Sequence, residues 1–116
     1  MSLESDLVTL LQTVCPRVSP DVAPTDTQRP YITWQQIGGD VIPQINGLPD
    51  KRNAMVQINC WAETRAQANA LALSVEAALV AATLFLARPV SALVAAHDED
   101  TDLRGAMQDF SIWAAR

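Results

Sequence analysis

The sequence predicts an α+β fold in which a mostly antiparallel four- to five-stranded sheet carries two helices packed on one face, in the order α-β-β-α-β-β. Three observations support this prediction. Apolar residues recur at helical spacing in two segments, they alternate with polar residues in others, and turn-forming residues separate these segments. The length of 116 residues favours one domain, 1–116, because domains usually comprise about 100 to 200 residues.

The first helix is expected from Leu3 to Val14. Ser2 is a suitable N-cap, acidic residues follow in the first turn, and leucines recur at helical spacing. Pro16 ends this helix, and the prolines that continue up to position 30 prevent both a helix and a central strand. This stretch is therefore expected to be a loop with room for a short edge strand over Arg17 to Ser19.

Two strands are expected on either side of a long loop. Tyr31 to Ile37 is rich in aromatic and β-branched residues and stops at a Gly-Gly-Asp turn signal. Asn53 to Trp61 alternates regularly, so that Ala54, Val56, Ile58 and Cys60 share one side of the strand. The intervening Val41 to Asp50 contains proline and glycine, which predict a hairpin loop and a candidate contact surface.

The second half of the chain predicts one helix and two further strands. Thr64 and Gln67 form a capping box, after which alanines and larger apolar residues predict a helix over 65–82. Few positions of this helix are polar, so we expect it to be covered on more than one side. Val90 to Ala96 and Ala106 to Trp113 are expected to be strands, separated by an acidic, solvated turn.

Composition excludes several classes of function. The chain has 8 Lys and Arg against 13 Asp and Glu, a net charge of −5, which disfavours a phosphate-binding surface. Two cysteines, Cys15 and Cys60, and one histidine are too few and too dispersed for a metal site, so we expect free thiols, no metal and no cofactor. No signal peptide is evident, and the apolar segment from Ala70 to Ala87 is interpreted as a buried helix in a cytosolically folded protein.

A catalytic interpretation would have to start from His97, which precedes the acidic residues 98–102. No second histidine, glycine-framed serine or cysteine at a catalytic spacing accompanies it. The acidic residues lack the glycine and distal glutamate of a calcium-binding loop. A solvated turn is therefore the favoured interpretation, and a small enzyme or ligand-binding domain that uses His97 is the alternative from another class.

One face of the predicted sheet gathers amide, hydroxyl and tryptophan side chains. If the apolar sides of the strands face the helices, the opposite face carries Tyr31, Thr33, Gln35, Gln57, Asn59, Trp61, Asp109, Ser111 and Trp113. Two interpretations stay open. The face is either solvated, with each tryptophan packed against a loop, or a contact between subunits, where Trp and Tyr are enriched.

Three segments in this order resemble the tail-completion proteins of long-tailed phages and prophages, also described as tail terminators or tail-to-head joining proteins. They are Arg29 to Gly39 (RPYITWQQIGG), Val56 to Thr64 (VQINCWAET) and Asp109 to Trp113 (DFSIW). The resemblance spans nearly the whole chain. Two stretches, Asp40 to Asp50 and Leu84 to Asp102, match no family pattern and are where partner specificity is expected.

The resemblance implies a structural protein without catalytic residues. It implies a ring, typically a hexamer, at the head-proximal end of the tail tube in the virion, assembled in the cytoplasm of the bacterial host. The ring would stop tube growth and join the tail to the head, so its partners would be other copies of the chain, the tail-tube protein and the head connector. No membrane and no specific nucleic-acid binding are expected, since the genome only passes through the ring. A head-completion or neck connector protein is the alternative within the same class.

The expected assembly surface combines the tryptophan-bearing sheet face with the long loop and the second helix. Apolar surface in excess of what a small core needs favours such contacts between subunits. The candidate interface residues are Tyr31, Gln35, Leu48, Gln57, Asn59, Trp61, Ala72 and Trp113.

Overall fold

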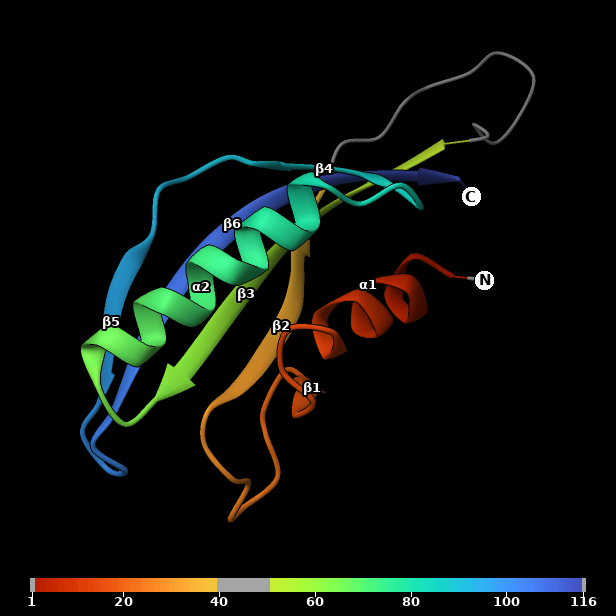
Figure 1. Ribbon diagram of the computed structural model, residues 1–116. Coiled ribbons are helices and arrows are strands. Elements are labelled where there is room, and N and C mark those ends of the chain that lie inside the picture. The colour runs from red at the N-terminus through yellow and green to blue at the C-terminus, as the bar shows by residue number, and fades with distance from the viewer. Residues whose placement is uncertain (1, 40–50, 116) are drawn as a thin grey trace.

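The computed structural model describes residues 2–39 and 51–115, which form an α+β fold with the element order α-β-β-β-α-β-β-β (Figure 1). The predicted fold class is confirmed, whereas the predicted order lacked two strands. The loop predicted over 41–50 lies outside the described residues. The elements are α1 (Leu3–Gln12), β1 (Val18–Pro20), β2 (Tyr31–Gly38), β3 (Lys51–Ala62), α2 (Arg65–Val80), β4 (Leu86–Pro89), β5 (Val94–Asp98) and β6 (Leu103–Ala115).

The sheet is built around the antiparallel pair of β3 and β6. Their register runs without interruption from Lys51 opposite Ala115 to Ala62 opposite Arg104. The described residues form a six-stranded sheet in the order β1-β2-β3-β6-β4, in which β5 also pairs with β6. β4 and β5 therefore share one side of β6, each alongside a different half of that strand. Only the pair of β1 and β2 is parallel, so the sheet is mixed but mostly antiparallel.

Both helices pack on the same face of the sheet and enclose the core (Figure 1). α1 contributes leucines at positions 3, 7 and 11, whose spacing of four places them on one side of the helix. α2 contributes Ala68, Ala72, Val75 and Leu79. The inward sides of β3 and β6 meet these residues with side chains that alternate with the outward ones, among them Val56, Ile58, Phe110 and Ile112.

The predicted strand over 90–96 is wrong in its position. The structure has two strands here, β4 at 86–89 and β5 at 94–98, and residues 90–93 between them belong to neither. In the sequence, Pro89 argues against a strand at this position, because proline cannot donate a hydrogen bond within a sheet. β4 tolerates Pro89 because it lies at the edge of the sheet, where one side of the strand needs no partner.

The helix starts were predicted well and the helix ends less well. The Ser2 side chain accepts a hydrogen bond from the Ser5 amide at 3.1 Å, and the Thr64 side chain accepts one from the Gln67 amide at 3.2 Å. α1 stops at Gln12, because the Thr13 amide and hydroxyl both donate to the carbonyl of Leu10 and close the last turn. Both helices are therefore two residues shorter than expected.

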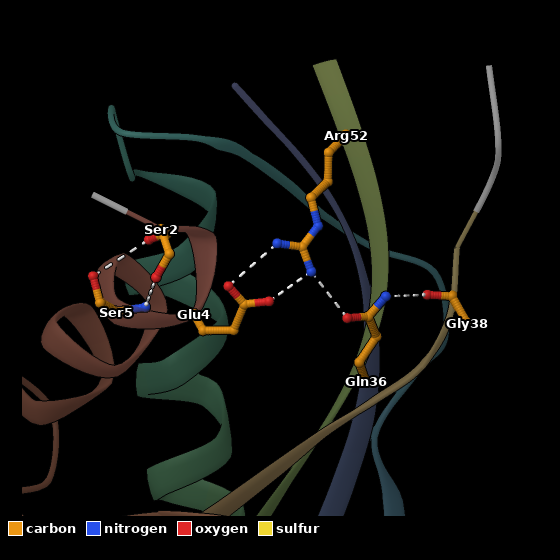
Figure 2. Close-up of polar contacts among 6 residues, drawn as sticks. All are labelled: Ser2, Glu4, Ser5, Gln36, Gly38 and Arg52. Atoms are coloured by element: carbon orange, nitrogen blue, oxygen red, sulfur yellow. Dashed lines mark hydrogen bonds and ion pairs between the residues drawn. The ribbon is translucent and has the colours of Figure 1, made fainter. Parts of the chain in front are cut away.

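An ion pair ties the first turn of α1 to the start of β3 (Figure 2). The two terminal nitrogens of Arg52 donate to the two carboxylate oxygens of Glu4 at 2.6 and 3.2 Å, and one of them also donates to Gln36 Oε1 at 3.1 Å. Gln36 in turn donates to the carbonyl of Gly38 at 3.2 Å. The hydrogen bond from Arg52 lowers the pKa of Glu4 below its ordinary value of 4.5. This network joins α1, β2 and β3 through polar contacts outside the apolar core.

We expect Glu4→Gln to lower the free energy of unfolding at neutral pH by up to about 1 kcal/mol, because the pair is partly exposed. Since the folded-state pKa of Glu4 is lowered, this stabilisation is present above pH 4.5 and is lost as the pH falls through the folded-state pKa. Urea unfolding of both proteins across that pH range measures the difference. Glu99→Gln, at an exposed carboxylate, is the control. A difference that stays constant down to the lowest pH would show that packing, not charge, explains the effect.

Candidate assembly surfaces

The outward face of the sheet brings together the polar and aromatic side chains that the alternation predicted. The register places Tyr31 opposite Trp61, Thr33 opposite Asn59, and Gln35 opposite Gln57. β6 continues these rows with Met107 and Asp109, and Trp113 pairs with Asn53 at the far end. Six of the predicted interface residues therefore share this face: Tyr31, Gln35, Gln57, Asn59, Trp61 and Trp113.

Hydrogen bonds between strands hold part of this face in place. The buried Asn53 side chain donates to Ser111 Oγ at 2.9 Å and to the carbonyl of Ile112 at 3.2 Å. Asn59 Nδ2 donates to Thr33 Oγ1 at 3.4 Å. The row formed by Gln35, Gln57 and Asp109 is half-buried. Its amide and carboxylate groups can accept and donate hydrogen bonds, so the face suits a polar contact or water better than an apolar partner.

Trp61 lies against its own sheet. A Cβ atom built on Gly105, directly opposite on β6, would come within 2.7 Å of the indole ring. Gly105 therefore allows the ring to lie flat over the neighbouring strand. The indole fills the space above the glycine and remains half-exposed. Trp113 pairs with Leu86 of β4 and lines an open hollow with Lys51 and Leu84.

The two remaining predicted interface residues lie elsewhere. Leu48 lies outside the described residues. Ala72 is 4% exposed and packs in the core between α2 and the sheet, so its side chain is covered within the subunit. A charge at Ala72 would therefore test folding rather than assembly, and Leu73 is the neighbouring position that faces outward.

The structure reveals an apolar strip that the sequence analysis did not identify as a unit. It consists of four large aliphatic side chains on α2 and on the segment that follows it, exposed between 46 and 65%: Leu73, Val80, Leu84 and Val90. Leu86 and Val94 are also exposed, but they pair with Trp113 and Met107 and therefore lie toward the outward face of the sheet. Exposed alanines at 66, 70 and 77 extend the strip along α2. The scarcity of polar residues predicted a helix covered on more than one side. In the subunit, the side of α2 that carries Leu73 and Val80 is exposed.

His97 and the acidic turn form a small surface cluster. His97 Nε2 lies 2.8 Å from Asp102 Oδ1, and Arg104 donates to the same oxygen at 3.1 Å. The hydrogen bond with His97 and the charge of Arg104 lower the pKa of Asp102 below its ordinary value. All three side chains are well exposed to solvent. The cluster is an exposed ion-pair network beside a shallow hollow that Thr101 and Leu103 help to line.

The two cysteines and the possible metal ligands are the other reactive groups in the described part of the chain. Cys15 and Cys60 are free and buried, and burial raises the pKa of the Cys60 thiol to about 12, which keeps it protonated and unreactive. Within residues 2–39 and 51–115, no group of three or more His, Cys, Asp or Glu side chains is arranged to hold a metal ion. Neither of the two helices in the described part of the chain has the length and hydrophobicity needed to cross a membrane.

The chain is thus an α+β subunit that exposes aliphatic side chains along α2 and carries polar and aromatic side chains on the outward face of its sheet. Residues 3–115 match the family described as tail completion protein gp17, and the chain belongs to this family. It is a structural family of the phage tail, not a family of enzymes, and the resemblance found in the sequence is confirmed.

The solved structures support the same fold. A chain in the structure titled "Virion of native gene transfer agent (GTA) particle" is similar to this one, with a TM-score of 0.68 and 20% sequence identity over 99% of this chain and 96% of that chain. At this identity the similarity establishes the fold. The search of curated proteins found no match. The chain is thus a member of the tail completion family, and its fold also occurs in a chain of an assembled virion particle.

We expect Gly105→Ala to lower the free energy of unfolding by about 1–3 kcal/mol, because the added methyl group must displace the Trp61 indole. Tryptophan fluorescence should report the altered environment of the ring, and urea unfolding gives the energy. Repeating the substitution in a Trp61→Leu background is the control, since the smaller side chain relieves the clash. An equal cost in both backgrounds would contradict the contact between the indole and Gly105.

His97→Ala should leave the free energy of unfolding within about 0.5 kcal/mol of the parent and leave particle assembly unchanged, because the network it belongs to is exposed. Thermal unfolding and the yield of infectious particles measure both quantities. Loss of particles with a folded variant would instead support a functional site at His97.

Proposed function

We propose that the protein forms a ring at the head-proximal end of the tail tube, where it ends tube polymerisation and joins the tail to the head. Family membership over residues 3–115 supports a role in tail completion. The observation that carries the ring is the apolar strip formed by Leu73 and Val80 of α2 with Leu84 and Val90. A structural tail protein that leaves such a surface open needs a protein partner to cover it.

Single exposed apolar side chains are normal on a soluble protein, whereas contiguous apolar patches mark interaction sites. Leu73 and Val80 share one side of α2, and Leu73 and Val90 line the same groove, so the strip joins the helix to the segment after it. Copies of the same chain are the partners that a closed ring requires.

The proposed partners are other copies of this chain, the tail-tube protein and the head connector. We propose six copies in the ring. The polar sheet face, with Tyr31, Gln35, Gln57, Asn59, Trp61 and Trp113, is the surface proposed for polar contacts with these partners. Leu48 remains a proposed contact on sequence grounds. The net charge of −5 favours a genome that passes through the ring without adhering to it.

The ring can form on the end of the tail tube, which acts as a template, even if the free protein forms no ring. Each contact between neighbours can be weak when the end of the tube holds several subunits close together, because the local concentration then replaces intrinsic affinity. The purified chain can therefore be monomeric and still form a ring on the tube.

The experiment adds purified protein to tails that lack it. We expect a ring-shaped cap at the head-proximal end of the tube in electron micrographs, and restored joining to heads. Tails that stay uncapped and unjoined in the presence of folded protein would refute the proposal. Joining without a cap on isolated tails would instead favour a neck connector that acts from the head side.

Leu73→Lys should reduce the yield of capped tails at least tenfold, because it places a charge in the apolar strip while its side chain stays outside the core. Thr9→Lys, at an exposed position of α1, is the matched control and should assemble normally. Circular dichroism and thermal unfolding establish that both variants fold. Normal assembly of a folded Leu73→Lys variant would exclude the strip as the contact between subunits.

A further inference from the structure

A ring of identical subunits needs two different surfaces on each copy, one for the neighbour on either side. This inference rests on the proposed ring. The sheet has two unlike edges, β1 at one end of the strand order and β4 with β5 at the other (Figure 1). Copies placed side by side would bring the β1 edge of one subunit to the β4 edge of the next.

Both edges are unsuited to joining by strand addition. β1 contains Pro20, and β4 contains Pro89. The Val90 amide donates to the carbonyl of Asp109, so by the alternation of an antiparallel ladder the nitrogen of Pro89 points away from β6. The free side of β4 thus lacks a donor at this position. A neighbour must dock here through side chains rather than through a continuous ladder of hydrogen bonds.

The β4 edge carries a groove suited to such docking. It lies between α2 and residues 89–93, and its lining is mostly aliphatic, including Leu73, Val90 and Leu93. Gln108, which is 6% exposed, also lines it. Its Nε2 donates to Glu76 Oε2 at 3.2 Å and to the carbonyl of Ser91 at 3.0 Å.

The amide of Gln108 leaves one acceptor unused. Its Oε1 is buried and has no hydrogen-bond partner among the described residues, which is costly for a buried polar atom. The Glu76 carboxylate, a second acceptor, lines the same groove together with the Ser91 hydroxyl. The groove therefore suits an aliphatic side chain accompanied by a cationic donor.

The β1 edge carries both of these groups. Val22, just after β1, is 80% exposed, which is the largest exposure among the large hydrophobic side chains of the described residues. Arg17, just before β1, donates through Nε to the carbonyl of Pro30 at 2.9 Å, so its terminal nitrogens can serve another acceptor. The edge thus combines an exposed aliphatic group with a positive charge.

The Val22 turn on one edge and the groove on the other edge also lie at the same position along the strand direction. Pairing partners run in one row from Pro20 through Trp34 and Ile58 to Gln108. The turn that carries Val22 therefore starts at the level of the groove floor. Neighbours that meet side by side need little shift along the strands to bring the two together.

We propose that the β1 edge of each copy docks into the Gln108 groove of the next copy, with Val22 between the aliphatic walls and Arg17 directed to Glu76 and Gln108 Oε1. The contact is head-to-tail, so it continues from copy to copy until the ring closes. Asp21, in the same turn as Val22, must stay at the solvent rim, away from Glu76.

The test cross-links the two edges in tails capped by the protein. A variant with Val22→Cys and Val90→Cys carries one new thiol at each edge. The native thiols are buried, so a short bis-maleimide should react with the new ones. We expect a ladder of covalent dimers, trimers and higher species up to the full ring. Each single variant should stay monomeric, as should the control pair Glu63→Cys with Val90→Cys, which moves one thiol to the exposed turn between β3 and α2.

The outcomes separate this inference from the proposed function. Ring-shaped caps without a ladder would overturn the edge pairing and leave the ring intact. Dimers formed by Val90→Cys alone would overturn it in favour of a two-fold contact between identical edges. Folded protein that forms no caps would refute the proposed ring and this inference with it.

Discussion

The uninterrupted antiparallel pairing of β3 with β6 is the constraint on which the rest of the structure depends. Because side chains alternate along both strands, one register assigns every residue between Lys51 and Ala62 to the helix side or to the outward side. A shift of one residue in β3 relative to β6 would turn the apolar side of one of the two strands outward, exposing either Val56 and Ile58 or Phe110. The same register that builds the core therefore aligns the polar outward face and places Gly105 beneath the Trp61 indole.

This division leaves the subunit with surfaces of different chemistry. The middle of the outward face is polar and partly fixed by hydrogen bonds between strands, whereas α2 exposes the aliphatic side chains of Leu73 and Val80. α2 is apolar on two sides. One side packs on the sheet through Ala68, Ala72, Val75 and Leu79, and the other exposes Leu73 and Val80. Prolines at both edges limit open-ended strand pairing, and the contacts they leave available are those of side chains.

Much of this architecture could be predicted from the sequence. The regular alternation from Asn53 to Trp61 identified the central strand and both of its faces, and the Thr64 capping box located the start of α2. The prediction failed where two signals conflicted. Pro89 concealed β4, since a proline is compatible with a strand only at an edge. In α2 the apolar residues on all sides left the helical phase undefined, so Ala72 was assigned to the surface although it lies in the core. The contacts of Glu4 with Arg52 and of Gln108 with Glu76 join residues far apart in the sequence, and no local pattern predicts them.

The measurement that tests the central claim most directly is a cryo-electron microscopy reconstruction of the head–tail junction in assembled particles. The account predicts a closed single-layer ring of this chain between the last layer of the tail tube and the head connector, with neighbouring copies in contact along the sides of their sheets. A junction without this chain, or one in which it occurs as an isolated copy or within the connector on the head side, would contradict the account.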